Sequence, residues 1–229
     1  MYLNHTEGTF TNIDILNNAA DDKGGGLFCH ESNPTFDNIN ISGNRTLDGD
    51  GAGIFLSGSS PSITNSIVSN NIAEGPVSAH GGGFFIDDSS NPEILNSQII
   101  NNASQDDGSG LHIRGSSQPL LNNVLIDNNN SGRFGGGLYS FSSSIPTLIN
   151  VDITNNTASK GAGIYLSGTT AILDSLQIRN NESGGSGGGI FIRDSNPQLS
   201  NITISENSAL FGGGIYLENA YPTFSADNR

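Results

Sequence analysis

The stretch ITNNTASKGAGIYL, residues 153–166, carries the signals that decide the fold. A branched aliphatic residue, Ile153, is followed three positions later by Asn156. A glycine triplet of the form G-[GAS]-G occupies residues 161–163, and a short apolar run follows at residues 164–166. An apolar run this short, bounded by Gly and Asn turn signals, is typical of a β-strand rather than a helix.

The same pattern recurs along the whole chain, so the chain is a repeat. The triplet returns at intervals of 25 to 30 residues, starting at Gly24, Gly51, Gly81, Gly108, Gly135, Gly161, Gly187 and Gly212. A proline follows the apolar run in seven of these eight copies. A fixed period of roughly 20 to 50 residues is the signature of a solenoid or a related repeat architecture.

Each copy contains three short β-type runs separated by Gly, Pro and Asn turn signals. A unit of this size cannot bury its apolar side alone, so neighbouring copies must stack strand on identical strand. The sequence therefore predicts an all-β, right-handed, single-stranded parallel β-helix with about eight coils of 25–30 residues each. We expect one β-helix domain over residues 1–229, forming a rod roughly 40 Å long.

The composition is explained by this repeat. The chain is rich in glycine (31 residues), and only 34% of it is hydrophobic. Asparagines at one position of every coil are expected to form a ladder of amide hydrogen bonds that satisfies buried backbone groups. The ladder positions are Asn18, Asn44, Asn71, Asn102, Asn129, Asn156, Asn181 and Asn207. Glycines at the opposite corner allow tight turns and close backbone approach.

Charge and cysteine content exclude several classes of protein. The chain has 8 basic and 22 acidic residues, a net charge of −14, so we expect no nucleic-acid partner. It lacks a run of roughly 18 apolar residues, so we expect no membrane-spanning segment. The N-terminal MYLNHTEGTF has neither a basic n-region nor an apolar h-region, so we expect no signal peptide in this sequence. The single Cys29 excludes a disulfide framework, and its inward position predicts a core residue.

These segments resemble a known group of proteins. ISENSALFGGGIYL (204–217), ITNNTASKGAGIYL (153–166) and IVSNNIAEGPVSAHGGGFFI (67–86) look like the right-handed, pectin-lyase-like β-helix repeats of bacterial secreted and cell-surface proteins. They are also similar to polymorphic outer membrane protein repeats, with Ile or Val where that family has Phe in its second motif. The resemblance implies a secreted or cell-surface location, often in a stalk or adhesin, and we expect this chain to be a segment of a longer array.

The first strand of each coil carries the main candidate binding site. Its first and third residues are aliphatic in almost every copy and should point inward, which directs the middle residue outward. The middle residues are Phe28, Phe55, Phe85, His112, Tyr139, Tyr165, Phe191 and Tyr216. We expect an exposed ladder of this size to stack on a polysaccharide or to contact a neighbouring protein domain. The alternative is that the rings stack only on one another for stability.

Charged residues near this strand form the candidate catalytic group. Asp87, Asp88, His112 and Arg114 resemble the base, the Ca²⁺ ligand and the charge clamp of a pectin-lyase-like enzyme. The alternative is that Asp87 and Arg114, like Arg193 and Glu218, are opposite charges stacked on adjacent strands.

Acidic loops are candidate Ca²⁺ sites, chiefly Asp48 and Asp50 in the sequence LDGDG, with Asp21-Asp22 and Asp106-Asp107 as further pairs. LDGDG lacks the remaining ligands of a calcium loop, so a solvated acidic loop is the alternative and no cofactor is required.

We expect a non-enzymatic scaffold or adhesin-like segment at a bacterial surface. A second possibility is a carbohydrate-binding or polysaccharide-degrading lyase or hydrolase that uses the first-strand face. A third is an inert structural spacer. A screen of glycans with and without Ca²⁺ distinguishes the three.

Overall fold

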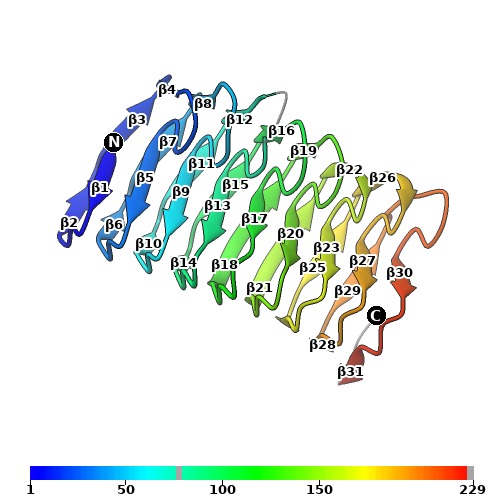
Figure 1. Cartoon of the computed structure of the whole chain (residues 1–229). Helices are drawn as coiled ribbons and strands as arrows, with labels where there is room; N and C mark the ends of the chain where they lie inside the picture. The colour runs from blue at the N-terminus through cyan, green and yellow to red at the C-terminus, as the bar shows by residue number, and fades with distance from the viewer. Residues whose placement is uncertain (76–78, 226–229) are drawn as a thin grey trace.

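The computed structural model describes residues 1–75 and 79–225. They form a parallel β-solenoid of about eight coils stacked along one axis, from β1 near the N-terminus to β30 and β31 near the C-terminus (Figure 1). The predicted fold class is confirmed. Within the described ranges, no helix is long and apolar enough to cross a membrane.

The first sheet has nine parallel strands, and all but β1 are the apolar runs that follow the glycine triplets. Its strands are β1 (Tyr2–Asn4), β5 (Leu27–His30), β9 (Ile54–Ser57), β13 (Phe84–Asp87), β17 (Leu111–Ile113), β20 (Leu138–Phe141), β23 (Ile164–Ser167), β27 (Ile190–Arg193) and β30 (Ile215–Glu218). Equivalent residues pair in register, so Phe28 lies beside Phe55 and Phe55 beside Phe85.

The second sheet has fifteen strands in two rows that bend around a corner. The row after the proline contains β2 (Thr9–Thr11), β6 (Thr35–Asp37), β10 (Ser62–Thr64), β14 (Glu93–Leu95), β24 (Ile172–Asp174), β28 (Gln198–Ser200) and β31 (Thr223–Ser225). The next row contains β3 (Asp14–Leu16), β7 (Asn40–Ser42), β11 (Ile67–Ser69), β15 (Gln98–Ile100), β25 (Gln177–Arg179) and β29 (Thr203–Ser205). Two long strands, β18 (Leu120–Asp127) and β21 (Thr147–Thr154), belong to both rows.

A third sheet of seven strands follows the ladder asparagines. Its strands are β4 (Ala19–Ala20), β8 (Arg45–Thr46), β12 (Ile72–Ala73), β16 (Ala103–Ser104), β19 (Asn130–Ser131), β22 (Thr157–Lys160) and β26 (Glu182–Ser186). The prediction of three β-type runs per coil was therefore one short, because these strands are too brief to show period-two alternation. Most coils contain four short strands in three sheets.

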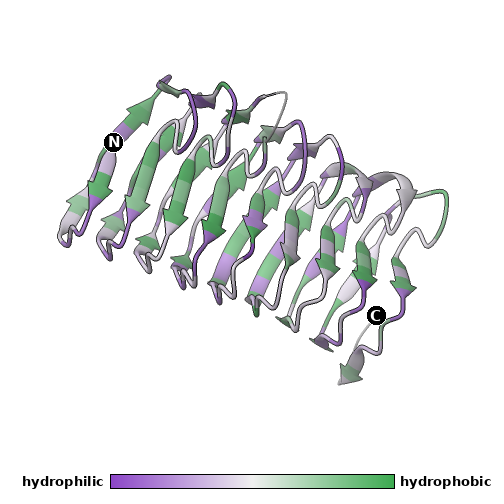
Figure 2. Ribbon diagram, in the orientation of Figure 1, coloured by the Kyte–Doolittle hydropathy of each residue, from purple (hydrophilic) through white to green (hydrophobic). Residues whose placement is uncertain are grey.

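The core is one continuous hydrophobic cluster along the axis. In β5, β9, β13, β17, β23 and β27 the first and third residues belong to it, for example Ile54 and Leu56 at 0% exposure. Figure 2 shows hydrophobic segments at the same place in successive coils. Cys29 belongs to this cluster, as predicted, and burial raises the pKa of its thiol to about 12.

The predicted asparagine ladder is present and fully bonded. Asn129 Oδ1 accepts hydrogen bonds from the backbone N and Nδ2 of Asn102 at 2.9 and 3.1 Å. Its Nδ2 donates to Asn156 Oδ1 and to the Ile99 carbonyl, both at 3.0 Å. Each ladder residue between Asn44 and Asn181 therefore joins its coil to both neighbours and satisfies buried backbone groups.

A second ladder, of hydroxyl groups, was not predicted from the sequence. The backbone N of Ser59 donates to Ser90 Oγ at 3.0 Å, and that of Ser90 donates to Ser117 Oγ at 3.2 Å. A signal was available, because a Ser or Thr stands two residues before most of the repeat prolines, as at Ser59 and Pro61.

Candidate functional site

The predicted aromatic ladder lies on the outer face of the first sheet. Its rings stack on successive coils, with centroids 4.9 Å apart for Phe55 and Phe85 and 4.7 Å apart for Phe85 and His112. Tyr165 and Phe191 are nearly parallel, with centroids 4.7 Å apart. None of these rings belongs to the central core cluster, so the inward–outward alternation follows the prediction.

The predicted exposure of this ladder was wrong. Phe55, Phe85, Tyr165 and Phe191 are at most 3% exposed and His112 is 2% exposed. Phe28, Tyr139 and Tyr216 are half-buried. Stacking hides the ring faces, and a second layer of side chains covers the ring edges.

The residues that directly precede the glycine triplets form a row, which we call the pre-triplet row, and four of them, Lys23, His80, Phe134 and Lys160, lie against the rings. The row consists of Lys23, Asp50, His80, Asp107, Phe134, Lys160, Ser186 and Phe211. Phe134 stacks on Tyr165 at 4.9 Å between centroids. Lys23 Nζ and Lys160 Nζ lie 5.2 and 5.5 Å from the ring centroids of Phe55 and Phe191, as cation–π contacts. The contact between this row and the rings cannot be read from the local sequence, because the conformation of the turn before each triplet decides whether these side chains reach the rings.

The other edge of the ladder is covered by charged residues of the candidate catalytic group. Arg114 Nε and Nη2 each lie 2.8 Å from Asp87 Oδ2, and the guanidinium lies 4.7 Å from the Phe85 ring centroid. Asp88 Oδ2 accepts a 2.6 Å hydrogen bond from Ser57 Oγ. The predicted stacking of Arg193 on Glu218 is also present, at 3.6 Å. Asp87 and Asp88 are thus engaged in contacts between coils.

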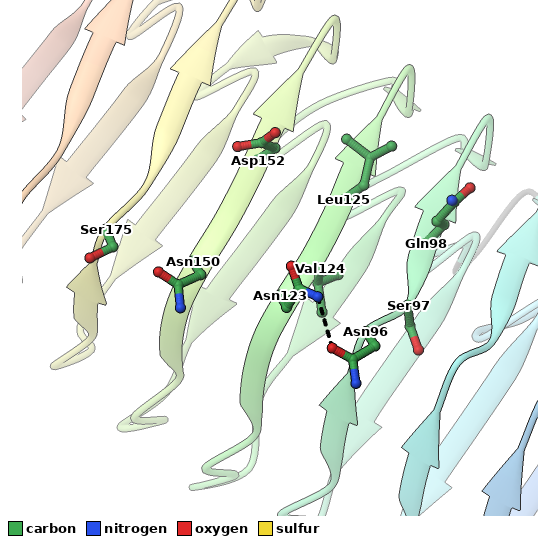
Figure 3. Close-up of a pocket in the computed structure, with 9 residues that line it drawn as sticks. All are labelled: Asn96, Ser97, Gln98, Asn123, Val124, Leu125, Asn150, Asp152 and Ser175. Carbon is green, nitrogen blue, oxygen red and sulfur yellow. Dashed lines mark hydrogen bonds between the residues drawn. The ribbon is translucent and has the colours of Figure 1, made fainter.

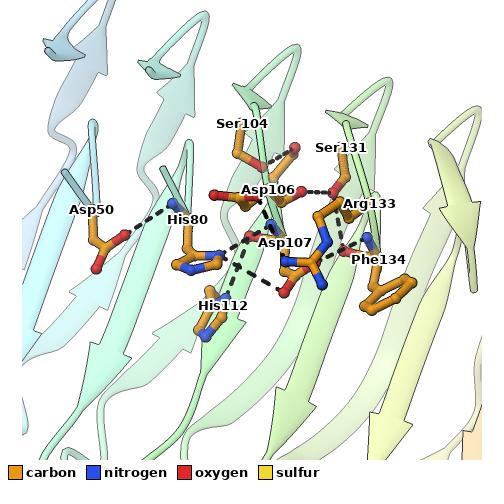
Figure 4. Close-up of polar contacts among 10 residues, drawn as sticks. Asp50, His80, Ser104, Asp106, Asp107, His112, Ser131, Arg133 and Phe134 are labelled. Carbon is orange, nitrogen blue, oxygen red and sulfur yellow. Dashed lines mark hydrogen bonds and ion pairs between the residues drawn. The ribbon is translucent and has the colours of Figure 1, made fainter. Parts of the chain in front are cut away.

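His112 faces a different group of residues. Among the described residues, no hydrogen bond or ion pair joins it to Asp87, Asp88 or Arg114. Instead, its Nδ1 lies 3.3 Å from the carbonyl oxygen of Asp107, and its ring centroid lies 4.7 Å from that of His80 (Figure 4). A carbonyl only accepts hydrogen bonds, so Nδ1 carries the proton and Nε2 carries a lone pair. Among the residues that the structure describes, Nε2 has no hydrogen-bond partner, and it is buried.

Burial controls the charges in this cluster. Burial lowers the pKa of His112 well below its ordinary value, and nearby His80 lowers it further. Burial raises the pKa of Asp107, against the opposing effects of Arg133 and His80. The Asp107 carboxylate accepts a hydrogen bond from the backbone N of Phe134 at 3.2 Å. The backbone N of Asp107 donates to His80 Nδ1 at 3.1 Å. His80 was missed from sequence because it lies in an insertion of coil three.

The candidate Ca²⁺ ligands are not brought together. Asp50 is 7% exposed, and its Oδ1 accepts a 2.9 Å hydrogen bond from the backbone N of His80. Asp48 is exposed. In the part of the chain that the structure describes, no group of three or more His, Cys, Asp or Glu side chains could hold a metal ion. Asp48 and Asp50 therefore do not form the ligand set that calcium prefers.

A polar groove lies at the bend of the second sheet, on different strands from the aromatic ladder (Figure 3). Its volume is about 510 Å³, and it spans four coils. The residues lining it are Asn96, Ser97, Gln98, Asn123, Val124, Leu125, Asn150, Asp152 and Ser175. Asn96, Asn123, Asn150 and Ser175 occupy the corner itself with φ between 50° and 58°, a conformation that Asn tolerates.

The stacked strands, ladders and glycine corners define a right-handed parallel β-solenoid. The family described as "Right handed beta helix region" matches residues 1–150 and 136–229, so the chain belongs to that family. A search of curated proteins finds no significant match. Among solved structures, the chain is similar to QnrB1, a plasmid-mediated fluoroquinolone resistance protein. The identity is 12%, the alignment covers 95% of this chain and 92% of that chain, and the TM-score is 0.24, which is too low to support an argument.

Proposed function

We propose that this chain is a non-enzymatic scaffold segment of a secreted or cell-surface protein. One observation carries the proposal: the ionisable side chains of the first-strand face are used in contacts between coils. Asp87 is held by Arg114, Asp88 by Ser57, and the face of His112 by Phe85. General acid–base catalysis requires a group that reaches the substrate, and these groups contact the protein itself.

The rod-like architecture supports the same role. Each coil contacts chiefly the coils on either side, so the core and the asparagine ladder run without interruption from coil to coil. Such a solenoid separates its two ends by a distance set by coil number. This property suits a stalk or an adhesin shaft.

A panel of neutral and acidic polysaccharides, incubated with the purified protein with and without Ca²⁺, tests this proposal. We expect no new reducing ends and no unsaturated products. Product formation that disappears in the D87N and H112F variants would overturn the scaffold role and establish the polysaccharide-degrading alternative. Surface proteolysis of the producing cells tests the location, since a cell-surface protein is cleaved without lysis.

A binding role for the first-strand face has one observation in its favour. Tyr139, Phe141 and Phe134 are half-buried rather than buried, and Arg133 lies beside them with 54% of its side chain exposed. Aromatic and arginine side chains are enriched in binding hot spots. The double variant Y139S/F141S tests this role: loss of glycan or protein binding with an unchanged fold supports it, and unchanged binding removes it.

A further inference from the structure

The groove at the bend of the second sheet has unused hydrogen-bonding capacity. Asn123 Nδ2 donates to Asn96 Oδ1 at 2.8 Å, and Asn123 Oδ1 accepts from no side chain of the described residues. Among the described residues, the side chains of Gln98, Asn150 and Asp152 make no hydrogen bond or ion pair. Asn96, Gln98, Asn123 and Asn150 are exposed, so these amides meet any molecule that enters the groove.

The groove also has a repeat distance. Its corner residues stand on successive coils, as the pairing of Leu95 with Asn122 and of Asn122 with Ile149 shows. Stacked strands are roughly 4.8 Å apart, so equivalent side chains recur at about that distance along the rod. One pyranose unit adds a similar length to an extended β-linked chain. A linear glycan aligned with the rod axis would therefore present each sugar to one coil.

The chemistry of the lining selects among extended ligands. Amide and hydroxyl groups both donate and accept hydrogen bonds, as sugar hydroxyls do. Leu125 is half-buried between the positions of Gln98 and Asp152 and offers an apolar contact for the C–H face of a sugar.

Charge and backbone geometry disfavour other ligands. In the described part of the chain no Lys or Arg lines the groove, and Asp152 lies within it. The whole chain carries a charge of −14, so a polyanion is repelled. A peptide adds to a sheet through a free strand edge, and these strands already pair on both sides.

We propose that this groove binds a neutral, linear polysaccharide along the rod axis. This inference goes beyond the scaffold role and does not depend on it. A scaffold that binds nothing in this groove remains a scaffold. The proposed site is also separate from the aromatic face, so variants can distinguish the two.

Calorimetric titration with cellohexaose, xylohexaose and hexagalacturonate tests the proposal. We expect at least one neutral hexasaccharide to bind with a Kd below about 1 mM, and hexagalacturonate to bind at least tenfold more weakly. The double variant N123G/N150G should lose about tenfold in affinity, since each removed side chain takes one or more hydrogen bonds with it. Glycine accepts the positive φ of both positions, so we expect the backbone to be unchanged.

A matched control exists in the same row. Asn38 has φ 53°, and its Nδ2 donates to Asn12 Oδ1 at 2.6 Å, as Asn123 donates to Asn96, but it lies outside the groove. N38G should bind like the unmodified protein. The proposal is overturned if no neutral hexasaccharide binds with a Kd below about 1 mM. It is also overturned if N123G/N150G binds the neutral hexasaccharide as tightly as the unmodified protein does, or if hexagalacturonate binds as tightly as the neutral hexasaccharide. Loss of binding in Y139S/F141S instead would assign the ligand to the aromatic face.

Discussion

At the residue scale, neighbouring asparagines have opposite roles. Asn129 is fully buried in the ladder, whereas Asn128 is exposed with φ 53° and makes one side-chain bond, to Asn101 at 2.6 Å. The amide of Asn129 joins three coils. Ile99 and Asn102 belong to the preceding coil, and Asn156 belongs to the following coil. The energetic weight of an asparagine therefore depends on which side of the corner it occupies.

Replacing Asn129 by Ala should destabilise the protein by about 3 kcal/mol, because it removes side-chain bonds and leaves buried backbone and amide groups unpaired. The midpoint of urea unfolding measures this effect. The control is N128G, which suits the positive φ of that position and should change stability by less than about 0.5 kcal/mol. Equal effects of the two variants would contradict the ladder's role.

His112 predicts a pH dependence of stability. Its pKa is lowered in the folded protein, so below about pH 6.5 the unfolded chain binds a proton that the folded chain does not. Stability is therefore full above about pH 6.5 and falls as the pH decreases, by up to about 1.4 kcal/mol per pH unit. Asp107, whose pKa is raised, acts in the opposite direction at lower pH.

The H112F variant isolates this effect. A phenyl ring at position 112 continues the stack from Phe85, whose ring lies nearly parallel to the imidazole at 4.7 Å. It also removes the unpartnered Nε2. We expect H112F to be more stable than the unmodified protein at pH 5.5 and to lose the decline between pH 8 and 5.5. An unchanged decline in urea titrations would show that other groups cause it.

At the element scale, the glycine triplets set how closely coils approach. A Cβ added to Gly83 would lie 2.6 Å from the Gly110 carbonyl oxygen of the next coil and 3.0 Å from Asn102 Nδ2. Neither atom can move without breaking the stack, because both are fixed by hydrogen bonds to adjacent coils. The third glycine of a triplet is therefore required for spacing, and the first, such as Gly81 with φ 65°, for its conformation.

G83A should therefore destabilise the protein by about 2–3 kcal/mol through forced separation of coils. The matched control is G184A in β26, a strand of the third sheet, where a Cβ would meet nothing within 4 Å and φ is not positive. G184A should be neutral or slightly stabilising, since Ala restricts the unfolded chain more than Gly. Thermal melts followed by circular dichroism compare the two, and similar losses would contradict the spacing argument.

At the scale of the whole molecule, each coil depends on its neighbours alone. The first sheet pairs β20 with β17 and β23, and the two long strands pair in the same sequential order. Such a structure has approximately additive stability, so whole coils are interchangeable units. Fractions of a coil are not, because they displace every inward residue from the core.

Deleting residues 135–160, one complete repeat, should leave a folded, shorter rod with modestly lower stability. The deletion removes one acid and one base, so the net charge is unchanged. Deleting residues 135–147 should abolish cooperative folding, because it takes the Asn ladder and the core positions of the following coils out of register. Small-angle scattering and circular dichroism measure both outcomes; a folded product from the partial deletion would contradict the model of register-dependent stacking.

The architecture could be predicted from the sequence because the repeat is strict. Glycine triplets, inward aliphatics and ladder asparagines return at fixed positions, and each has one physical role in a stacked coil. The stacking of Arg114 on Asp87 also followed from register alone. The fourth strand was missed because most copies of it are only two residues long. The hydroxyl ladder was missed because its residues are small and polar and therefore produce little hydropathy signal.

The sequence alone determined the fold, the core and which side chains face outward, since these depend on periodicity along the chain. Only the tertiary structure decided which outward side chains reach solvent. The aromatic ladder is outward yet buried, because the pre-triplet row folds over it from loops of variable length. The polar groove appears for a related reason: the bend of the second sheet gathers exposed amides from separate coils. Exposure and concavity depend on the positions of neighbouring coils, and no single repeat encodes them.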